Sequence, residues 1–221
     1  MIAWIFLAVQ LLTNLRTDME CDFSTLATTD YGNILGVEHF LDFNIRPLWQ
    51  GMPRIAGEAY TVQLASGDNL MLHAAIYEAP KGSILLIDGV DCEYAVAGGN
   101  VCAVAMQRGI KGFVIDGVIR DLGEIQAMNF PVYAKGVFPV PGKKNAYAEL
   151  GQPVNCGGVR ASTGDMVVAD AEGIAVIPKL EAESVYLAAS AKADAESQLT
   201  LAEWEVTHRQ KIAQAVDKAR N

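Results

Sequence analysis

The stretch that decides the fold runs from Gly109 to Asp121 and reads GIKGFVIDGVIRD. Its apolar, mostly β-branched centre from Phe113 to Ile115 is bounded by glycines, which predicts a strand buried on both faces of a sheet. Asp116-Gly117 is a turn dipeptide and predicts a tight turn with positive φ at Gly117. The stretch ends in an adjacent cation and anion, and loops at strand ends often carry chemistry.

This terminal pair has two interpretations. Arg120 is a planar, permanently charged fork suited to a carboxylate, and Asp121 is a hard oxygen ligand suited to Mg²⁺ or Mn²⁺, so together they suit a metal-bound α-keto acid. Alternatively, Asp121 caps a helix that begins beside it, with Glu124 three residues later, and Arg120 forms an ordinary surface ion pair. A capping carboxylate keeps one free oxygen, so the interpretations are compatible.

Composition bounds the remaining possibilities. The chain has 221 residues, of which 51% are hydrophobic and 19% charged, as expected for one well-packed domain or two small ones. Acidic residues outnumber basic ones by 26 to 17 and no basic cluster occurs, so we expect no nucleic-acid partner. The four cysteines are scattered without a CxxC pair, which argues against a zinc site and a disulfide framework and favours buried thiols in the cytoplasm.

The N-terminus is unusually apolar. Residues 1–12 read MIAWIFLAVQLL, which is too short to span a bilayer, and no basic residue precedes them as in a signal peptide. We interpret residues 1–24 as an apolar extension and expect no membrane association.

Further along, short buried strands alternate with helices, which predicts an α/β fold in layers. Strands are predicted within 52–64, 82–89 and 130–136, helices at 70–79 and 98–109, a hairpin series over 159–178, and one or two long helices after 179. Asp68 and Asn69 are candidate caps of the helix that carries His73, which we interpret as a packing or surface residue.

A glycine-rich segment, Gly98-Gly99-Asn100-Val101-Cys102, opens the second predicted helix. Free backbone N–H groups at the positive end of a helix can bind an anion such as a carboxylate. The segment lacks the spacing of the GxGxxG and GxxxxGK[ST] phosphate motifs, and a simple tight loop is the alternative.

The ordered set of motifs resembles the RraA-like family, which includes the 4-hydroxy-4-methyl-2-oxoglutarate/4-carboxy-4-hydroxy-2-oxoadipate aldolases. The resemblance covers roughly residues 25 to 200, and its pieces are 55–62 (IAGEAYTV), 67–69 (GDN), 82–88 (GSILLID), 108–121, 153–159 (PVNCGGV), 164–170 (GDMVVAD) and 173–178 (GIAVIP). It implies a layered β/β/α swivelling-type domain with C-terminal helices, assembled as a trimer or hexamer with active sites between subunits. The implied division is a catalytic domain at 25–180 and a C-terminal helical segment for oligomer contacts at 181–221.

The resemblance also implies a site. Residues Gly98, Gly99, Asn100, Val101 and Cys102 would supply amides to a small 2-oxo carboxylate, Arg120 would hold it, and Asp121 would serve Mg²⁺ or Mn²⁺. A neighbouring subunit would donate a metal-site glutamate, for which Glu196 is the first choice by position and Glu203 the second. The implied reaction is retro-aldol cleavage to pyruvate, with oxaloacetate decarboxylation as a side activity. Related aldolases carry an acid where this chain has Gly99, so proton transfer has no assigned residue.

Two other functions fit the same resemblance. Some relatives are non-catalytic regulators that bind a ribonuclease; they lack an acid after the arginine, whereas Asp121 is present here. A structural oligomer with a vestigial site would fit Gly99. Metal-dependent turnover separates the enzyme from both, and ribonuclease binding separates the two from each other.

Overall fold

The computed structural model describes residues 21–220, so most of the predicted apolar extension lies outside the described part of the chain. Within residues 21–220, no helix combines the length and apolarity needed to cross a bilayer. The helices are α2 (Thr28–Gly32), α3 (Leu70–Glu78), α4 (Gly99–Gln107), α5 (Leu122–Ala127), α6 (Ala182–Ser197) and α7 (Leu201–Arg220), with 3₁₀ turns η1 (Phe23–Thr25) and η2 (Val37–His39). The strands are β1 (Arg46–Pro47), β2 (Ile55–Gln63), β3 (Ile84–Asp88), β4 (Gly112–Ile119), β5 (Val132–Val137), β6 (Val154–Cys156), β7 (Val159–Ala161), β8 (Met166–Ala169) and β9 (Ile174–Ile177).

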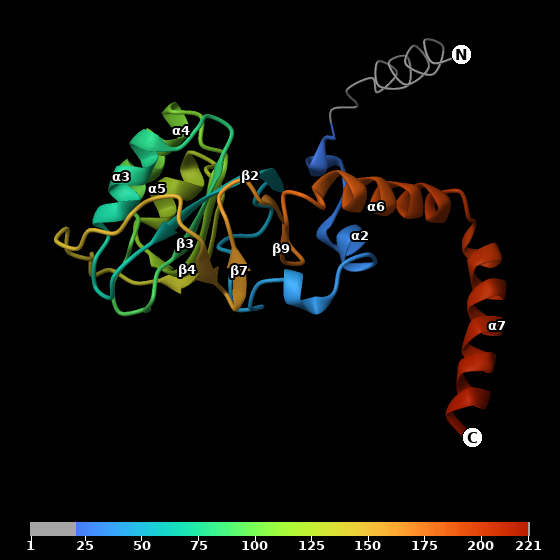
Figure 1. Cartoon of the computed structure of the whole chain (residues 1–221). Helices are drawn as coiled ribbons and strands as arrows, with labels where there is room; N and C mark the ends of the chain where they lie inside the picture. Colours follow the sequence, from blue (N-terminus) through green and yellow to red (C-terminus); the bar gives the residue numbers. More distant parts are fainter. Residues whose placement is uncertain (1–20, 221) are drawn as a thin grey trace, which may run out of the picture.

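The main sheet has the strand order β1-β5-β4-β3-β2-β8-β9. Its centre, β2 to β5, is parallel, while β1, β8 and β9 run antiparallel to their neighbours. Helices α3, α4 and α5 cover one face (Figure 1). The β6–β7 hairpin packs against the other face through one continuous apolar cluster. The layered α/β prediction is therefore confirmed.

Alternation along the central strands explains these layers. Phe113 and Ile115 belong to the core under the helices, where Phe113 meets Phe130 edge to face with ring centroids 5.0 Å apart. Val114 lies between them in sequence and joins the opposite core, with Val154 and Cys156 of the hairpin. A strand buried on both faces needs apolar residues at every position, as the opening stretch has.

The predicted turn at Asp116-Gly117 is wrong. Both residues lie inside β4, where the register against β5 shifts between Ile115 and Val118. The Asp116 carboxylate accepts a hydrogen bond from the Gly157 amide (2.7 Å) and pairs with the Lys135 ammonium. Because strands hydrogen-bond to β4 on both sides, the dipeptide forms an irregularity within the strand.

The hairpin series is confirmed in part. β8 and β9 form the predicted hairpin, joined by the turn at 171–173. β7 instead pairs with β6, because the chain crosses from one layer to the next at 162–165. There the Thr163 hydroxyl accepts a hydrogen bond from the Thr61 amide (3.1 Å).

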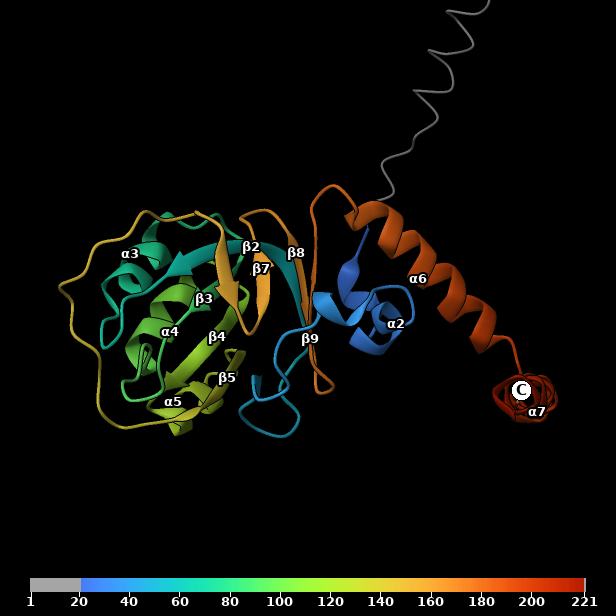
Figure 2. The same ribbon diagram turned by 60° about the horizontal axis from the view of Figure 1, so that its bottom comes forward.

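The predicted C-terminal helices are confirmed as α6 and α7. α6 packs on α2 and the β8–β9 edge through Val185 and Ala189, with Tyr31, Val168 and Ile177 beneath. α7 has no buried residue in the described chain, and it projects from the body (Figures 1 and 2). These helices lie at the end of the sheet opposite α4 and α5.

Candidate functional site

The site begins where β4 ends. Arg120 follows the strand and donates its backbone N–H to the Ala97 carbonyl (3.0 Å), which ties the strand end to the segment that leads into α4. Asp121 is left-handed (φ 59°), a conformation that aspartate tolerates better than most residues. Its Oδ2 accepts a hydrogen bond from the Gly99 amide (3.2 Å) and lies 3.5 Å from Arg120 Nε.

This geometry corrects the capping interpretation. Asp121 occupies the N-cap position of α5, but its side chain makes no capping hydrogen bond to that helix. It turns back instead to the first residue of α4. Its other oxygen, Oδ1, makes no hydrogen bond or ion pair with the described residues, so it can ligate a cation.

The two glycines at the start of α4 allow this close approach. A Cβ atom on Gly98 would lie 2.5 Å from Asp121 Oδ2 and 3.2 Å from Arg120 Nε. A Cβ atom on Gly99 would collide with the Glu124 carboxylate. Hence the space that a side chain at 99 would fill is already taken by an acid from α5.

Some backbone amides at the start of α4 already donate hydrogen bonds to other groups of the protein. The Gly99 amide donates to Asp121, and the Cys102 amide donates to the Gly98 carbonyl (3.1 Å) within the helix. The expectation that Cys102 supplies an amide to a ligand is therefore wrong, because the helix uses that donor itself. Asn100 and Val101 line the pocket, and their amides lie in the first turn of α4, where no intrahelical acceptor exists.

The Cys102 thiol is also unsuited to act as a nucleophile. Burial, with a smaller contribution from the charge of Asp121, raises the pKa of Cys102 to about 12, so it is a neutral thiol at physiological pH. Cys102 and Cys156 are buried free thiols, as predicted, whereas Cys92 is exposed and Cys21 half-buried.

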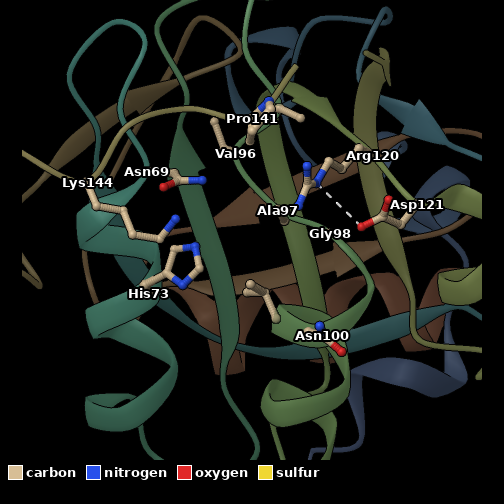
Figure 3. Close-up of a pocket in the computed structure, with 12 residues that line it drawn as sticks. Asn69, His73, Val96, Ala97, Gly98, Asn100, Arg120, Asp121, Pro141 and Lys144 are labelled. Carbon is tan, nitrogen blue, oxygen red and sulfur yellow. Dashed lines mark ion pairs between the residues drawn. The ribbon is translucent and has the colours of Figure 1, made fainter. Parts of the chain in front are cut away.

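Arg120 and Asp121 form one side of a pocket of about 390 Å³, counting its open mouth (Figure 3). The opposite side carries Asn69 and His73 from the start of α3 and Lys144 from a loop later in the chain. The whole lining comprises Asn69, His73, Ala95, Val96, Ala97, Gly98, Asn100, Val101, Arg120, Asp121, Pro141 and Lys144.

A buried carboxylate holds that opposite side together. Asp68 accepts hydrogen bonds from the amides of Leu70 (2.8 Å), Asn145 (2.6 Å) and Ala146 (3.2 Å). Burial raises its pKa, but these three amides and the Lys144 charge outweigh burial, and the net pKa is lowered. Asp68 therefore joins the loop that carries Lys144 to the helix that carries His73.

Asn69 and His73 were not predicted as site residues. They are four residues apart at the start of one helix, which places them on the same face, but nothing near them in sequence marks Lys144 as their neighbour. Asn69 is 4% exposed, and its Oδ1 has no hydrogen-bond partner among the described residues. An unsatisfied buried acceptor costs about 1–3 kcal/mol, which a ligand could recover.

The predicted metal ligands do not come together within the described part of one chain. No group of three or more His, Cys, Asp or Glu side chains is placed to hold a metal ion within residues 21–220. Glu196 is exposed near the C-terminal end of α6, a helix that lies on the other side of the molecule from α4 and α5 (Figure 2). Glu203 caps α7, since its carboxylate accepts from the Thr200 amide (2.9 Å) and hydroxyl (2.7 Å). Donation of Glu196 by a neighbouring subunit stays a prediction.

Comparison with known proteins relates this geometry to a family. A Halalkalibacterium halodurans protein named "Putative 4-hydroxy-4-methyl-2-oxoglutarate aldolase" is 39% identical over 82% of this chain and 86% of its own length. An uncharacterized protein from Pseudomonas syringae pv. tomato has a similar structure, with a TM-score of 0.73 and 29% identity over 85% of this chain and 92% of its own. The "RNA-processing inhibitor RraA from Thermus thermophilis" has a TM-score of 0.63 and 25% identity over 70% of this chain and 93% of its own.

The family match covers most of the described chain. Residues 21–176 match the RraA-like family, described as Aldolase/RraA, and this range spans β1 to nearly the end of β9 as well as the whole pocket. The resemblance predicted from the motifs is thereby confirmed. The chain belongs to the RraA-like family.

Proposed function

We propose that the chain is a divalent-metal-dependent lyase that cleaves a 4-hydroxy-2-oxo di- or tricarboxylate into pyruvate and a second oxo acid. The observation that carries this proposal is the Arg120–Asp121 pair, held by the Gly99 amide at the open first turn of α4 on the edge of a pocket. The aldolase name of the Halalkalibacterium halodurans relative supports the same reaction class.

Each residue of the pair has a role that its chemistry allows. The Arg120 guanidinium binds the 1-carboxylate and 2-oxo oxygens, and the amides of Asn100 and Val101 bind the same carboxylate at the positive end of α4. Asp121 Oδ1 serves Mg²⁺ or Mn²⁺. One carboxylate suffices for such a fit, because Mg²⁺ commonly keeps several waters and takes further oxygens from its substrate.

The reaction breaks the C3–C4 bond of the substrate. The C4 hydroxyl loses its proton, the bonding electrons move through C3 to the C2 oxygen, and the resulting enolate gains a proton at C3 to become pyruvate. The metal ion supplies Lewis-acid stabilisation of negative charge on that oxygen, and Arg120 adds its positive charge. Oxaloacetate loses CO₂ through the same enolate, so we expect decarboxylation as a side activity.

The direct test is pyruvate release from oxaloacetate and from 4-carboxy-4-hydroxy-2-oxoadipate, with Mg²⁺ or with EDTA. We expect chelator-sensitive release above the rate of free Mg²⁺, and loss of at least 100-fold in Arg120→Ala. Arg160 is an exposed arginine on β7, outside the pocket, so Arg160→Ala is the matched control and should retain full activity. An active Arg120→Ala variant would contradict the site assignment.

Asp121 is best tested with asparagine. Asn has the shape of Asp and also tolerates the left-handed conformation, whereas Asp121→Ala would add backbone strain to the loss of the carboxylate. Asp121→Asn should abolish metal-dependent release while its melting temperature stays within a few degrees of wild type, since no cap of α5 is lost. A loss of stability with activity retained would restore the capping interpretation.

The Thermus relative supports a regulatory function as the alternative, because that protein is described as an RNA-processing inhibitor. If neither substrate gives chelator-sensitive pyruvate, a ribonuclease-binding measurement separates a regulator from an oligomer with a vestigial site. We propose the enzyme in the cytoplasm, as a trimer or hexamer in which Glu196 of one subunit completes the metal site of the next.

A further inference from the structure

We propose that Asn69, His73 and Lys144, together called the α3 wall, bind the half of the substrate that leaves as the second oxo acid. Lys144 binds the carboxylate of that half, the side-chain nitrogen of Asn69 donates a hydrogen bond to one of its oxygens, and His73 takes the hydroxyl proton during cleavage. The inference rests on the proposed function and names the substrate feature that the site selects, a carboxylate on the far side of C4.

The charges of the pocket support this assignment. Arg120 and Lys144 line the same pocket from opposite sides (Figure 3). The chain carries a net charge of −9, so two cations facing one pocket are a local exception to its overall charge. Opposed cations suit a ligand with anionic groups at both ends, and pyruvate alone would leave Lys144 without an anion.

Asn69 adds a donor to the same wall. Its Oδ1 is buried and has no partner among the described residues, whereas its side-chain nitrogen points toward the middle of the pocket (Figure 3). An amide nitrogen donates, so it suits a carboxylate or hydroxyl oxygen of the ligand.

His73 is the proton acceptor on this wall. It is half-buried beside Lys144 and lies across the pocket from Asp121. Burial, and then the Lys144 charge, lower the pKa of His73, which keeps the imidazole neutral at physiological pH. The imidazole receives the proton as the C4–O bond becomes a carbonyl, and the imidazolium can return it to C3 of the enolate, so protons balance over one turnover.

Lys144→Gln tests the carboxylate contact by binding alone. Calorimetry with Mg²⁺ compares 2-oxoglutarate with 2-oxobutanoate, which has the 2-oxo acid end but no second carboxylate. The wild type should bind the diacid at least tenfold more tightly, and Lys144→Gln should remove that preference without weakening 2-oxobutanoate binding. Lys143 is also exposed but does not line the pocket, so Lys143→Gln should keep the preference. Equal preference in Lys144→Gln and wild type would overturn the proposal.

This binding test does not depend on turnover. If wild type binds the diacid preferentially through Lys144 but cleaves nothing, the proposed function fails and the wall stands as a diacid-binding site. If wild type cleaves 4-hydroxy-4-methyl-2-oxoglutarate and Lys144→Gln leaves its KM unchanged, the function stands and the wall fails. Borohydride added with pyruvate should not inactivate the enzyme, and inactivation of the wild type that Lys144→Gln abolishes would make Lys144 a covalent nucleophile.

His73→Gln tests the proton transfer. We expect kcat for cleavage to fall about 100-fold, within the usual range for a general base, with KM changed less than threefold. Exchange of the pyruvate methyl protons in D₂O tests whether the same imidazole serves C3, in which case its metal-dependent rate should fall as much as the rate of cleavage. Unchanged kcat would remove His73 from the proposal.

Discussion

At the scale of single residues, Gly98 sets the geometry of the site because it has no Cβ atom. Its backbone is extended (φ −150°, ψ −177°), so any residue could adopt its conformation. The requirement is for space, because a Cβ atom there would lie 2.5 Å from Asp121 Oδ2. The sequence showed a glycine-rich helix start, but it could not show that the glycine makes room for two residues more than twenty positions away.

Gly98→Ala should therefore strongly reduce activity without unfolding the protein. Displacement of Asp121 and Arg120 should lower pyruvate release at least tenfold, with a melting temperature within a few degrees of wild type. Gly123→Ala is the control, since a Cβ atom at Gly123 in the first turn of α5 meets nothing within 4 Å. Equal activity in Gly98→Ala and Gly123→Ala would contradict this account.

At the scale of elements, periodicity predicted most strands and helices, because burial on both faces requires unbroken apolar runs such as 84–87 and 113–115. It failed at Asp116-Gly117, where the local turn preference is overridden by pairing with β3 and β5. The chemistry of the residue types after the strand, not periodicity, predicted the Arg120–Asp121 pair, and no sequence pattern pointed to the α3 wall. Lys144 lies near His73 because the hydrogen bonds of the Asp68 side chain, and backbone hydrogen bonds of Gly67 and Asn69 with Lys143, connect segments about 75 residues apart.

Asp68→Asn tests that connection. The carboxylate accepts from three amides, and hydrogen bonds to charged groups contribute about 1.5–3 kcal/mol each, so we expect a loss of about 2 kcal/mol in unfolding free energy at pH 7. The pKa of Asp68 is lowered in the fold, so its contribution is full above the ordinary value of 3.8 and disappears as the pH falls through the folded value.

Urea unfolding of both proteins at pH 7 and near pH 3 provides the measurement. The difference between wild type and Asp68→Asn should shrink at the lower pH, because pH 3 lies below the ordinary value of 3.8, so the carboxyl group of the unfolded wild type is mostly protonated and part of the folded carboxylate's contribution is lost. Asp42→Asn is the control, since Asp42 is exposed and caps only a local turn at Asn44. A difference that is constant with pH, or absent at pH 7, would show that Asp68 does not stabilise the fold through its charge.

At the scale of the whole molecule, the described chain leaves surfaces that a neighbouring subunit could cover. α7 carries exposed Leu201, Trp204, Val206, Ile212 and Val216 and has no buried residue. An isolated helix is only marginally stable in water, and packing of its apolar face against another surface usually stabilises it. The domain division at residue 180 and the oligomer contacts of 181–221 stay predictions, but these exposed residues are what such contacts would require.

Glu196 offers the sharpest test of assembly, because within one chain it belongs to α6, which lies on the other side of the molecule from α5, the helix that follows Asp121 (Figure 2). If sites form between subunits, Arg120→Ala and Glu196→Gln inactivate different halves of each site. Mixed oligomers assembled from equal amounts of the two inactive variants would then contain sites with both native halves, about one quarter of the total by random assortment.

Denaturing the two variants together, refolding them and measuring pyruvate release should accordingly recover about one quarter of wild-type activity. Each variant refolded alone should remain inactive, and a mixture of Arg120→Ala with Asp121→Asn serves as the control, since both changes affect the same half-site. Recovery in the first mixture only would place Glu196 in the site of a neighbouring subunit. Full activity of Glu196→Gln by itself would remove Glu196 from the metal site, and recovery in neither mixture would mean that each site is built within one subunit.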